Sequence, residues 1–312
     1  MPTIKKQIKF SGVGIHSGAL VNMLVKPSKK QGIFFHRIDM SDKLIPASFD
    51  NVGDTKMRNT TIGKLSGEHV KTIEHLMAAL FIAGVDSAII DIDGSETPIL
   101  DGSAKQFYNE IYNAGITPGK LKKIIVRRSI IVTSHEALRQ LSWFTRMKIY
   151  IMNFLSGRKT NGFVQLSPSN NGALNISATL VYPEKIIGSQ SFTYSFDGTK
   201  KTVKEFVKNI ASARTFGKFS EWEYLKSHGM ARGANETNVI ALNDKGDGTL
   251  NKIFWPNEFV RHKIIDAIGD MFTSGGFIIG NLESYKGSHA MNNIILRKLF
   301  SNPANYDIID AE

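Results

Sequence analysis

Three polar side chains recur at four-residue intervals in the segment FVRHKIIDAIGD (259–270). His262, Asp266 and Asp270 would share one face of an α-helix, because residues four apart stack on the same side. Histidine and aspartate are metal ligands, so the pattern is compatible with half of a metal site. Spacing alone favours a simpler interpretation, a solvated helix face. Ligands from elsewhere in the chain must decide between the two.

A second pair of candidates, Glu74 and His75, lies in KTIEHLMAALFIAG (71–84), whose apolar residues have helical spacing. Alone, such a pair is ordinary at a helix start. The chain has no cysteine, so a metal site must use His, Asp or Glu. A zinc hydrolase then needs three ligands, an open position for water and a carboxylate base. His75, His262 and Asp266 would be the ligands. Glu74 would be the base.

Two more histidines lie in short glycine-containing motifs. His289, in KGSHAMNN (286–293), is expected at the start of the last helix. Taken by itself, it is most simply interpreted as a side chain that faces solvent. His16 lies in GVGIHSG (12–18), which is not a GxGxxG motif opening a helix and so argues against a dinucleotide site. The residues alone assign His16 no chemical step.

The elements that must position these residues follow the same plan in each half of the chain, strands first and two helices after. The first half comprises strands over 4–50, a helix over 71–84 ending at Gly84, a strand over 88–92 and a helix over 103–115 with Ser103 as N-cap. The second half comprises strands over about 124–195, a helix opening at Thr202, an irregular Gly-rich stretch over 215–234, a helix from near Asn257, a short strand over 276–280 and a last helix over 289–300.

This repeated plan predicts an α+β fold built from a duplicated unit. The stretch GITPGKLKK (115–123) is typical of a linker. We therefore expect an N-terminal α+β domain over 1–118, a C-terminal α+β domain over 119–300 and a tail over 301–312. The length of 312 residues and the hydrophobic content of 42% are sufficient for two such domains.

The net charge of +11 suits a polyanionic partner or simply a lysine-rich surface. The lysines are scattered and form no basic tail, which argues against nucleic acid. The chain has no apolar run of 18 residues and no signal-peptide pattern at its start. We therefore expect a cytoplasmic protein without a spanning helix.

Six segments of the chain, taken together, form a recognisable set of motifs: SGVGIHSG (11–18), TIEHLMAAL (72–80), ETPILDGSA (96–104), SARTFG (212–217), FVRHKIIDAIGD (259–270) and KGSHAMNN (286–293). Their sequences, their order and approximately their spacing resemble those of the zinc-dependent UDP-3-O-acyl-N-acetylglucosamine deacetylases. These enzymes catalyse the committed step of lipid A biosynthesis. The resemblance covers about residues 4–300. It implies two similar α+β domains, each a sheet with two packed helices, and an active site between them.

The resemblance also implies roles for individual residues. Zn2+ would be held by His75, His262 and Asp266. The implied catalytic residues are Glu74 as general base toward water, Thr215 at the oxyanion, Lys263 at the substrate or its developing charge, and His289 with Asp270 as the acid pair for the leaving amine. A helix N-terminus disfavours an imidazolium, and Asp270 would oppose that effect by raising the pKa of His289.

The implied substrate is a UDP-linked acylated glucosamine, which loses its N-acetyl group as acetate. Lys263 would contact the diphosphate, and the stretch after TFG would help line a tunnel for the acyl chain. The candidates for binding this part of the substrate are Phe216, Trp222, Leu225, Met230 and Ala231, although core packing explains such residues equally well. Lys218 and Trp222 depart from the aromatic and smaller apolar residues usual in the family, and leave the acyl-chain length open. We expect a monomer that binds no nucleic acid.

The segment HEALRQLSWFTRMKIYIMNFLSGRKTNG (135–162) is longer than the family pattern. It is apolar and basic, and it is too short and too charged to span a bilayer. An extended hairpin or added packing is the simpler interpretation. The alternative is a surface element that makes peripheral contact with membrane lipid and collects a lipid-linked substrate.

Two other functions remain open at this point. A 2-His-1-carboxylate iron enzyme would use the same ligands, His75, His262 and Asp266. Acetate release without oxygen discriminates against it. A non-enzymatic nucleic-acid-binding α+β protein would account for the charge and would bind oligonucleotides in a salt-dependent way. It gives no reason for the positions of the histidines and aspartates.

Overall fold

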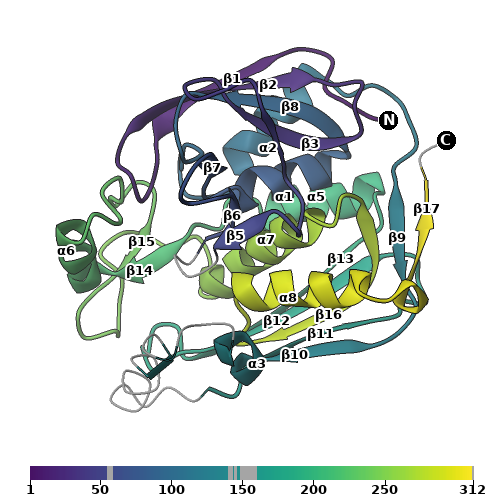
Figure 1. Cartoon of the computed structure of the whole chain (residues 1–312). Coiled ribbons are helices and arrows are strands. Elements are labelled where there is room, and N and C mark those ends of the chain that lie inside the picture. The colour runs from purple at the N-terminus through teal and green to yellow at the C-terminus, as the bar shows by residue number, and fades with distance from the viewer. Residues whose placement is uncertain (55–58, 140–142, 144–145, 148–159, 311–312) are drawn as a thin grey trace.

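Two large β-sheets enclose a layer of helices in the part of the chain that this computed structural model describes, residues 1–54, 59–139, 143, 146–147 and 160–310 (Figure 1). The helices pack between the sheets because each sheet has one apolar face that must be covered. The mixed α+β class predicted from the sequence is confirmed. The division into domains at 118/119 stays a prediction.

The N-terminal sheet has the strand order β1-β2-β8-β3-β4. Its strands are β1 (Ile8–Val13), β2 (Leu20–Pro27), β8 (Ser87–Ile92), β3 (Gly32–Arg37) and β4 (Leu44–Pro46). Neighbours are antiparallel except β3 and β8, which run parallel. Alternate residues face the helices, as in β2, where Val21, Met23 and Val25 are buried.

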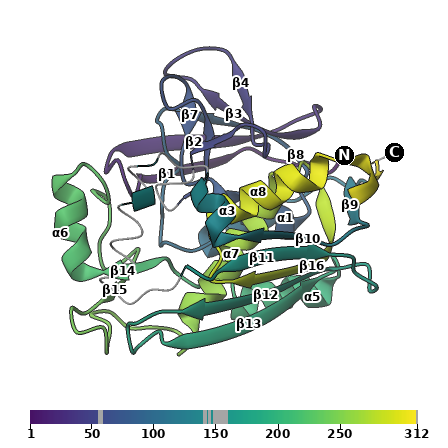
Figure 2. The ribbon, with the colours of Figure 1, turned by 60° about the horizontal axis from the view of Figure 1, so that its bottom comes forward.

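The C-terminal sheet has the strand order β10-β11-β16-β12-β13, and β9 joins it through β16 (Figure 2). Its strands are β10 (Ile130–Thr133), β11 (Phe163–Ser167), β16 (Phe277–Tyr285), β12 (Leu174–Val181), β13 (Ser189–Phe196), β9 (Lys123–Val126) and β17 (Tyr306–Ile309). β17 pairs antiparallel with β9. The segment 301–312, expected to be a tail, therefore contributes a strand to this sheet.

The helices whose bounds lie within the described residues are α1 (Glu74–Ala83), α2 (Lys105–Ala114), α3 (Ser134–Arg139), α5 (Lys200–Asn209), α6 (Phe219–Ser227), α7 (Glu258–Phe272), α8 (His289–Phe300) and the 3-10 helix η1 (Pro303–Asn305). α1 is apolar and buried on all sides, as expected of a central helix. It packs on α7, and α7 and α8 pack on the C-terminal sheet. Gly269 makes the α1–α7 contact close, because a Cβ there would lie 2.0 Å from the carbonyl oxygen of Glu74.

Two smaller sheets complete the architecture. One joins β5 (Val52–Asp54), β6 (Thr61–Gly63) and β7 (His69–Val70). The other pairs β14 (Phe216–Lys218) in parallel with β15 (Ile240–Leu242), and α6 connects them. Both views place this β14–α6–β15 unit to one side of the main layers (Figures 1 and 2).

Several expected elements are confirmed with small shifts. Gly84 ends α1 in a left-handed conformation, as predicted. α7 begins after Asn257 and α8 covers 289–300, also as predicted. α5 begins at Lys200 with Thr199 as N-cap, two residues before the expected start.

Two expectations about local structure are wrong. Ser103 is not the N-cap of α2, because the helix begins at Lys105 and Ala104 takes the cap position. The Ser103 hydroxyl instead donates to Asp101 at 2.8 Å and accepts from the Lys105 N–H at 3.1 Å. The stretch 215–234 is not irregular, since it contains β14 and α6; burial of Trp222 against Ala231 and Val239 stabilises it despite its glycines.

The prediction of a hairpin or membrane-surface element at 135–162 falls largely outside the described residues, which omit 140–142, 144–145 and 148–159 of it. The described part contains most of α3, and the side chain of Trp143 is exposed. Among the helices of the described residues, none is both long enough and apolar enough to cross a membrane.

Candidate active site

The candidate metal ligands come from two helices that pack against each other. α1 carries His75, and α7 carries His262 and Asp266 one turn apart. Asp266 Oδ1 lies 3.6 Å from His75 Nε2 and 3.3 Å from His262 Nε2. One donor atom from each residue lies within 4.8 Å of the others, and the side chains are buried. The structure therefore brings together the ligand set that the sequence suggested.

Hydrogen bonding and burial put His262 in the form that binds a metal ion. Its Nδ1 lies 3.0 Å from the carbonyl oxygen of Ala213, so the ring donates there and Nε2 keeps a lone pair. Burial lowers the pKa of His262 to about 3, so the ring is neutral at physiological pH. Two imidazoles and one carboxylate, without sulfur, suit Zn2+ in a site with an open position.

Lys263 lies beside the ligand carboxylate. Its Nζ is 2.6 Å from Asp266 Oδ2 and 5.8 Å from the centre of the Phe216 ring. Burial would raise the pKa of Asp266, but the Lys263 ammonium and a hydrogen bond from His75 outweigh burial and hold this pKa well below its usual range. Burial would lower the pKa of Lys263, and Asp266 raises it instead. Asp266 is therefore ionised, and Lys263 carries a positive charge at the cavity wall.

Glu74 is the first residue of α1 and lines the same cavity as the ligands. Its side chain is buried, and its Oε2 accepts a hydrogen bond from the main-chain N–H of Thr60 at 3.1 Å. Burial raises the pKa of Glu74 above its usual value. A carboxylate with a raised pKa takes up a proton more readily, as a general base must.

His289 and Asp270 form a buried pair on the α8 side of the site. His289 Nδ1 lies 2.7 Å from Asp270 Oδ2, and Asn292 Nδ2 donates to the same oxygen at 2.9 Å. Burial would lower the pKa of His289, but Asp270 outweighs it and the pKa is raised to about 9. The ring is therefore a cation near neutral pH. Its Nε2 lies 3.9 Å from Asp266 Oδ2, on the side of the metal ligands.

A buried ion pair fixes the segment that carries Thr215. Arg214 Nε lies 3.0 Å from Glu258 Oε1, and the main-chain N–H of Arg214 donates to the same oxygen at 3.1 Å. Glu258 opens α7, so the pair ties the segment to the helix that bears the ligands. This contact holds the Ala213 carbonyl against His262 and places Thr215 at the cavity wall.

The cavity has a volume of about 350 Å³ and runs from the ligands into the β14–α6–β15 unit. Of the residues proposed from the sequence for the acyl chain, Phe216, Trp222, Leu225 and Ala231 line it. Met230 does not belong to this lining. Lys218 also lines the cavity, and its Nζ pairs with Glu184 at 2.9 Å.

Glu96 holds the glycine-rich N-terminal loop against the cavity. Its carboxylate accepts from the main-chain N–H groups of His16 and Ser17 at 2.9 to 3.1 Å, and from the Thr72 hydroxyl at 2.9 Å. A Cβ at Gly14 would lie 2.4 Å from Glu96 Oε2, so a larger residue there would displace this carboxylate. His16 thereby lines the cavity, although the sequence assigned it no role.

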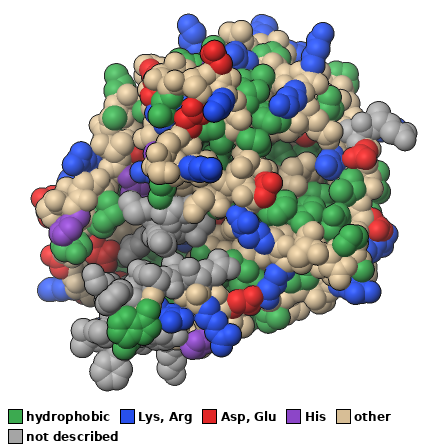
Figure 3. Space-filling view, viewed as in Figure 1, with side chains coloured by type: hydrophobic (Ala, Val, Ile, Leu, Met, Phe, Trp, Pro, Cys, Tyr) green, Lys and Arg blue, Asp and Glu red, His purple; other side chains and the backbone are tan. Residues whose placement is uncertain are grey.

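Sequence reasoning also missed Asn59 and Thr60. Asn59 lines the cavity, and Thr60 contacts both Glu74 and Asp270. Both residues precede β6, in a short segment with no helical or strand periodicity of its own. On the face of the molecule seen in Figure 3, Lys and Arg side chains are spread out rather than gathered in one patch.

Comparisons with known proteins agree with this geometry. Residues 1–301 match a family model described as UDP-3-O-acyl N-acetylglycosamine deacetylase. Among curated proteins, the chain is similar to the UDP-3-O-acyl-N-acetylglucosamine deacetylases of Nitratiruptor sp. (34% identity; 99% of this chain and 93% of that protein), Myxococcus xanthus (35%; 99% and 89%) and Sulfurimonas denitrificans (35%; 99% and 94%).

Proposed function

Because the chain belongs to the UDP-3-O-acyl N-acetylglycosamine deacetylase family, we propose that it hydrolyses the N-acetyl group of UDP-3-O-acyl-N-acetylglucosamine in lipid A biosynthesis. The products are acetate and the free amine. The observation that carries the proposal is the convergence of a His-His-Asp cluster, a buried glutamate and a histidine–aspartate pair at one cavity.

The metal in this proposal is Zn2+, held by His75, His262 and Asp266. The support is the chemistry of the donors: neutral imidazole nitrogen at His262, an ionised carboxylate at Asp266 and no cysteine in the chain. When bound, Zn2+ supplies a Lewis acid that polarises the amide carbonyl and makes water more acidic.

The residues around the ligands divide the bond-forming half of the reaction between them. Glu74 takes a proton from the attacking water as the new C–O bond forms. Thr215 donates a hydrogen bond to the carbonyl oxygen as negative charge develops there. Lys263 places its ammonium at the same wall of the cavity and also meets the diphosphate of the substrate.

The bond-breaking half belongs to His289 and Asp270. As the C–N bond breaks, the amine nitrogen takes a proton, and His289 donates it from Nε2. Asp270 accepts from Nδ1 and stabilises the cationic ring that does so. The role of Asp270 is therefore electrostatic and orienting.

The acyl chain of the substrate occupies the apolar part of the cavity in this proposal. Phe216, Trp222 and Ala231 are the residues that would contact it, and they line the cavity together. In this proposal the enzyme acts as a monomer in the cytoplasm. The chain has no cysteine and so forms no disulfide bonds, which is compatible with the reducing conditions there. Peripheral contact with membrane lipid through 135–162 also stays a proposal.

Acetate release from UDP-3-O-acyl-N-acetylglucosamine tests the function. Glu74→Gln keeps the size of the side chain and removes the base, so we expect kcat to fall at least about 100-fold. Glu110→Gln, on the exposed face of α2, is the matched control and should retain wild-type kcat. Acetate release under nitrogen excludes the iron-oxygenase alternative. Full activity of Glu74→Gln would overturn the assigned base.

A further inference from the structure

Thr60 lies between the proposed base and the proposed acid, and the mechanism above gives it no part. It is buried directly before β6. Its main-chain N–H donates to Glu74 Oε2 at 3.1 Å, and its hydroxyl donates to Asp270 Oδ1 at 2.5 Å. One residue therefore touches both carboxylates, although the two belong to different helices.

The main chain of Thr60 is fixed against the first turn of α1. Besides the N–H that binds Glu74, its carbonyl oxygen accepts from the main-chain N–H of Ile73 at 3.4 Å. Main-chain groups cannot rotate away as a side chain can. The position of Thr60 relative to Glu74 is therefore set by the fold.

The hydroxyl of Thr60 fixes the second carboxylate. The hydroxyl donates to Asp270 Oδ1, which accepts as a carboxylate oxygen. Oδ2 of the same group accepts from His289 and Asn292. With both oxygens engaged, the carboxylate cannot turn about its own axis, and the His289 ring is held with it. Thr60 Oγ1 also lies 3.3 Å from His289 Nδ1.

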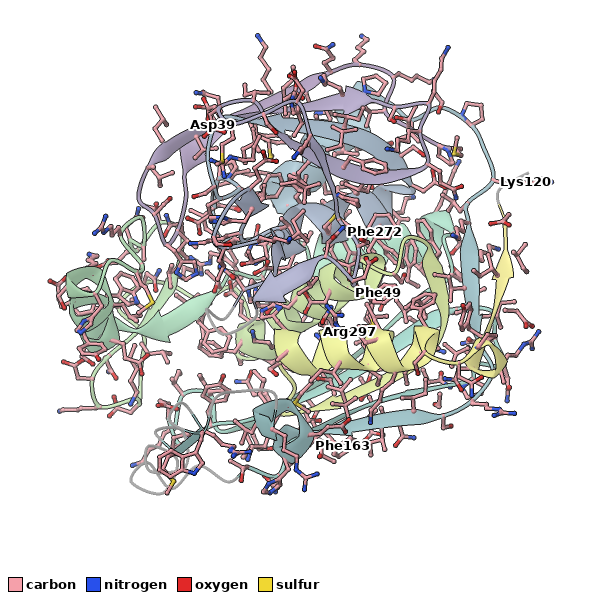
Figure 4. The ribbon with its side chains drawn as sticks, in the orientation of Figure 1. Asp39, Phe49, Lys120, Phe163, Phe272 and Arg297 are labelled. Atoms are coloured by element: carbon pink, nitrogen blue, oxygen red, sulfur yellow. The ribbon has the colours of Figure 1, made fainter. Side chains whose placement is uncertain are left out.

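Residues 49–52, which lead into β5, are anchored without this hydroxyl. The Phe49 N–H donates to the carbonyl oxygen of Thr273 at 2.8 Å, after the end of α7. Arg297 of α8 donates to the carbonyl oxygen of Val52 at 3.1 Å. Figure 4 labels Phe49 beside Arg297 of α8, and Arg297 also donates to the carbonyl oxygen of Asp50, the residue after Phe49. Residues 49–52 are therefore held against the end of α7 and against α8 by contacts that do not involve the Thr60 hydroxyl.

We propose that Thr60 is a positioning residue of the deacetylation, and this inference rests on the proposed function. It sets the place of the Asp270–His289 pair relative to Glu74, so that the group that takes a proton and the group that gives one act on the same amide. The proposal is specific to the hydroxyl, because the main-chain bond to Glu74 is present whatever the side chain. Displacement of a reacting group by about 1 Å can cost about 100-fold in rate.

Three variants of Thr60 test the inference through steady-state acetate release. Thr60→Val keeps the shape and the main-chain N–H but loses the hydroxyl, and Thr60→Ala loses it without a new methyl group. We expect kcat to fall about 10- to 100-fold in both, the usual effect of removing a group that orients a reacting residue. KM should stay unchanged, because Thr60 does not line the cavity. Thr60→Ser should restore kcat.

Thr61→Val is the matched control. Thr61 is also buried, is the adjacent residue and donates through its hydroxyl to Asn59 Oδ1 at 3.1 Å. We expect this variant to keep wild-type kcat, even if it unfolds at a lower temperature. Should Thr60→Val fail to fold, Thr60→Ala carries the comparison.

A double-mutant cycle separates positioning from general loosening of the fold. In a His289→Ala background the residue through which Thr60 acts is gone, so Thr60→Val should change kcat little further. The inference is overturned if Thr60→Val and Thr60→Ala keep wild-type kcat, if serine does not restore it, or if the loss is as large without His289. A wild-type enzyme that releases no acetate removes the proposed function itself, and with it this inference.

Discussion

Gly269 offers a sharp test of how the two ligand-bearing helices are held together. A Cβ at this position would lie 2.0 Å from the carbonyl oxygen of Glu74 and 2.7 Å from its carbonyl carbon. Ordinary Cβ contacts begin at 3.4 Å, so Gly269→Ala must separate α7 from α1 by about 1.4 Å. The two atoms of Glu74 that the new Cβ would meet belong to the main chain, so rotation of a side chain cannot relieve the contact. A close-packed interior then transmits the strain to its surroundings.

Two effects of opposite sign compete in this variant. Alanine in place of glycine inside a helix stabilises by about 0.5–1 kcal/mol, whereas overpacking a core costs about 1–3 kcal/mol. We therefore expect Gly269→Ala to lower the free energy of unfolding by about 1–2 kcal/mol. Separation of the helices also moves Glu74 and His75 away from His262 and Asp266, so kcat should fall about 100-fold. Urea unfolding and acetate release measure the two effects.

Gly67 provides the control for this substitution. It lies between β6 and β7, and a Cβ there would have only the carbonyl oxygen of Lys64 near it, at 4.0 Å. Gly67→Ala should keep wild-type kcat and stability. Wild-type stability and kcat in Gly269→Ala would refute the reasoning that the close α1–α7 contact sets the geometry of the ligands.

Three further outcomes follow from the same contacts. Asp270→Asn removes the group that raises the pKa of His289 to about 9; the basic limb of the pH–rate profile should move to lower pH, and an unmoved limb would contradict the pairing. Glu258→Gln leaves Arg214 buried without its counter-charge and should cost about 3–5 kcal/mol in urea unfolding, whereas an unchanged midpoint would show the pair to be dispensable. Removal of metal with a chelator should lower Tm, and added Zn2+ should restore it; a Tm indifferent to both would contradict a metal held by α1 and α7.

The parts of the site that could be predicted from the sequence are those on helices. The four-residue spacing of His262, Asp266 and Asp270 requires only helix geometry, and the apolar pattern of 259–272 was sufficient to predict that helix. Glu74 and His75 also lie on a helix with clear apolar spacing. That α1 and α7 pack together, however, depends on sheets that are far apart in sequence, so spacing alone could not join the two sets. The resemblance to a family supplied that link.

The parts that escaped prediction depend on contacts between distant segments. Thr60 owes its place to hydrogen bonds with residues on α1 and α7, and nothing in its own surroundings in the sequence marks it. Ser103 looked like a cap because the residue type is right, but Asp101 engages its hydroxyl in a turn before the helix. The stretch 215–234 looked irregular from its glycines, whereas burial of Trp222 organises it into β14 and α6.

Metal content measured together with acetate release tests the central claim most directly. The purified protein should contain Zn2+ and release acetate from UDP-3-O-acyl-N-acetylglucosamine. His262→Ala, which removes one ligand, should lose both the metal and the activity, while His228→Ala at the exposed end of α6 should lose neither. A wild-type protein loaded with Zn2+ that releases no acetate, or a His262→Ala variant that keeps both metal and activity, would contradict the account.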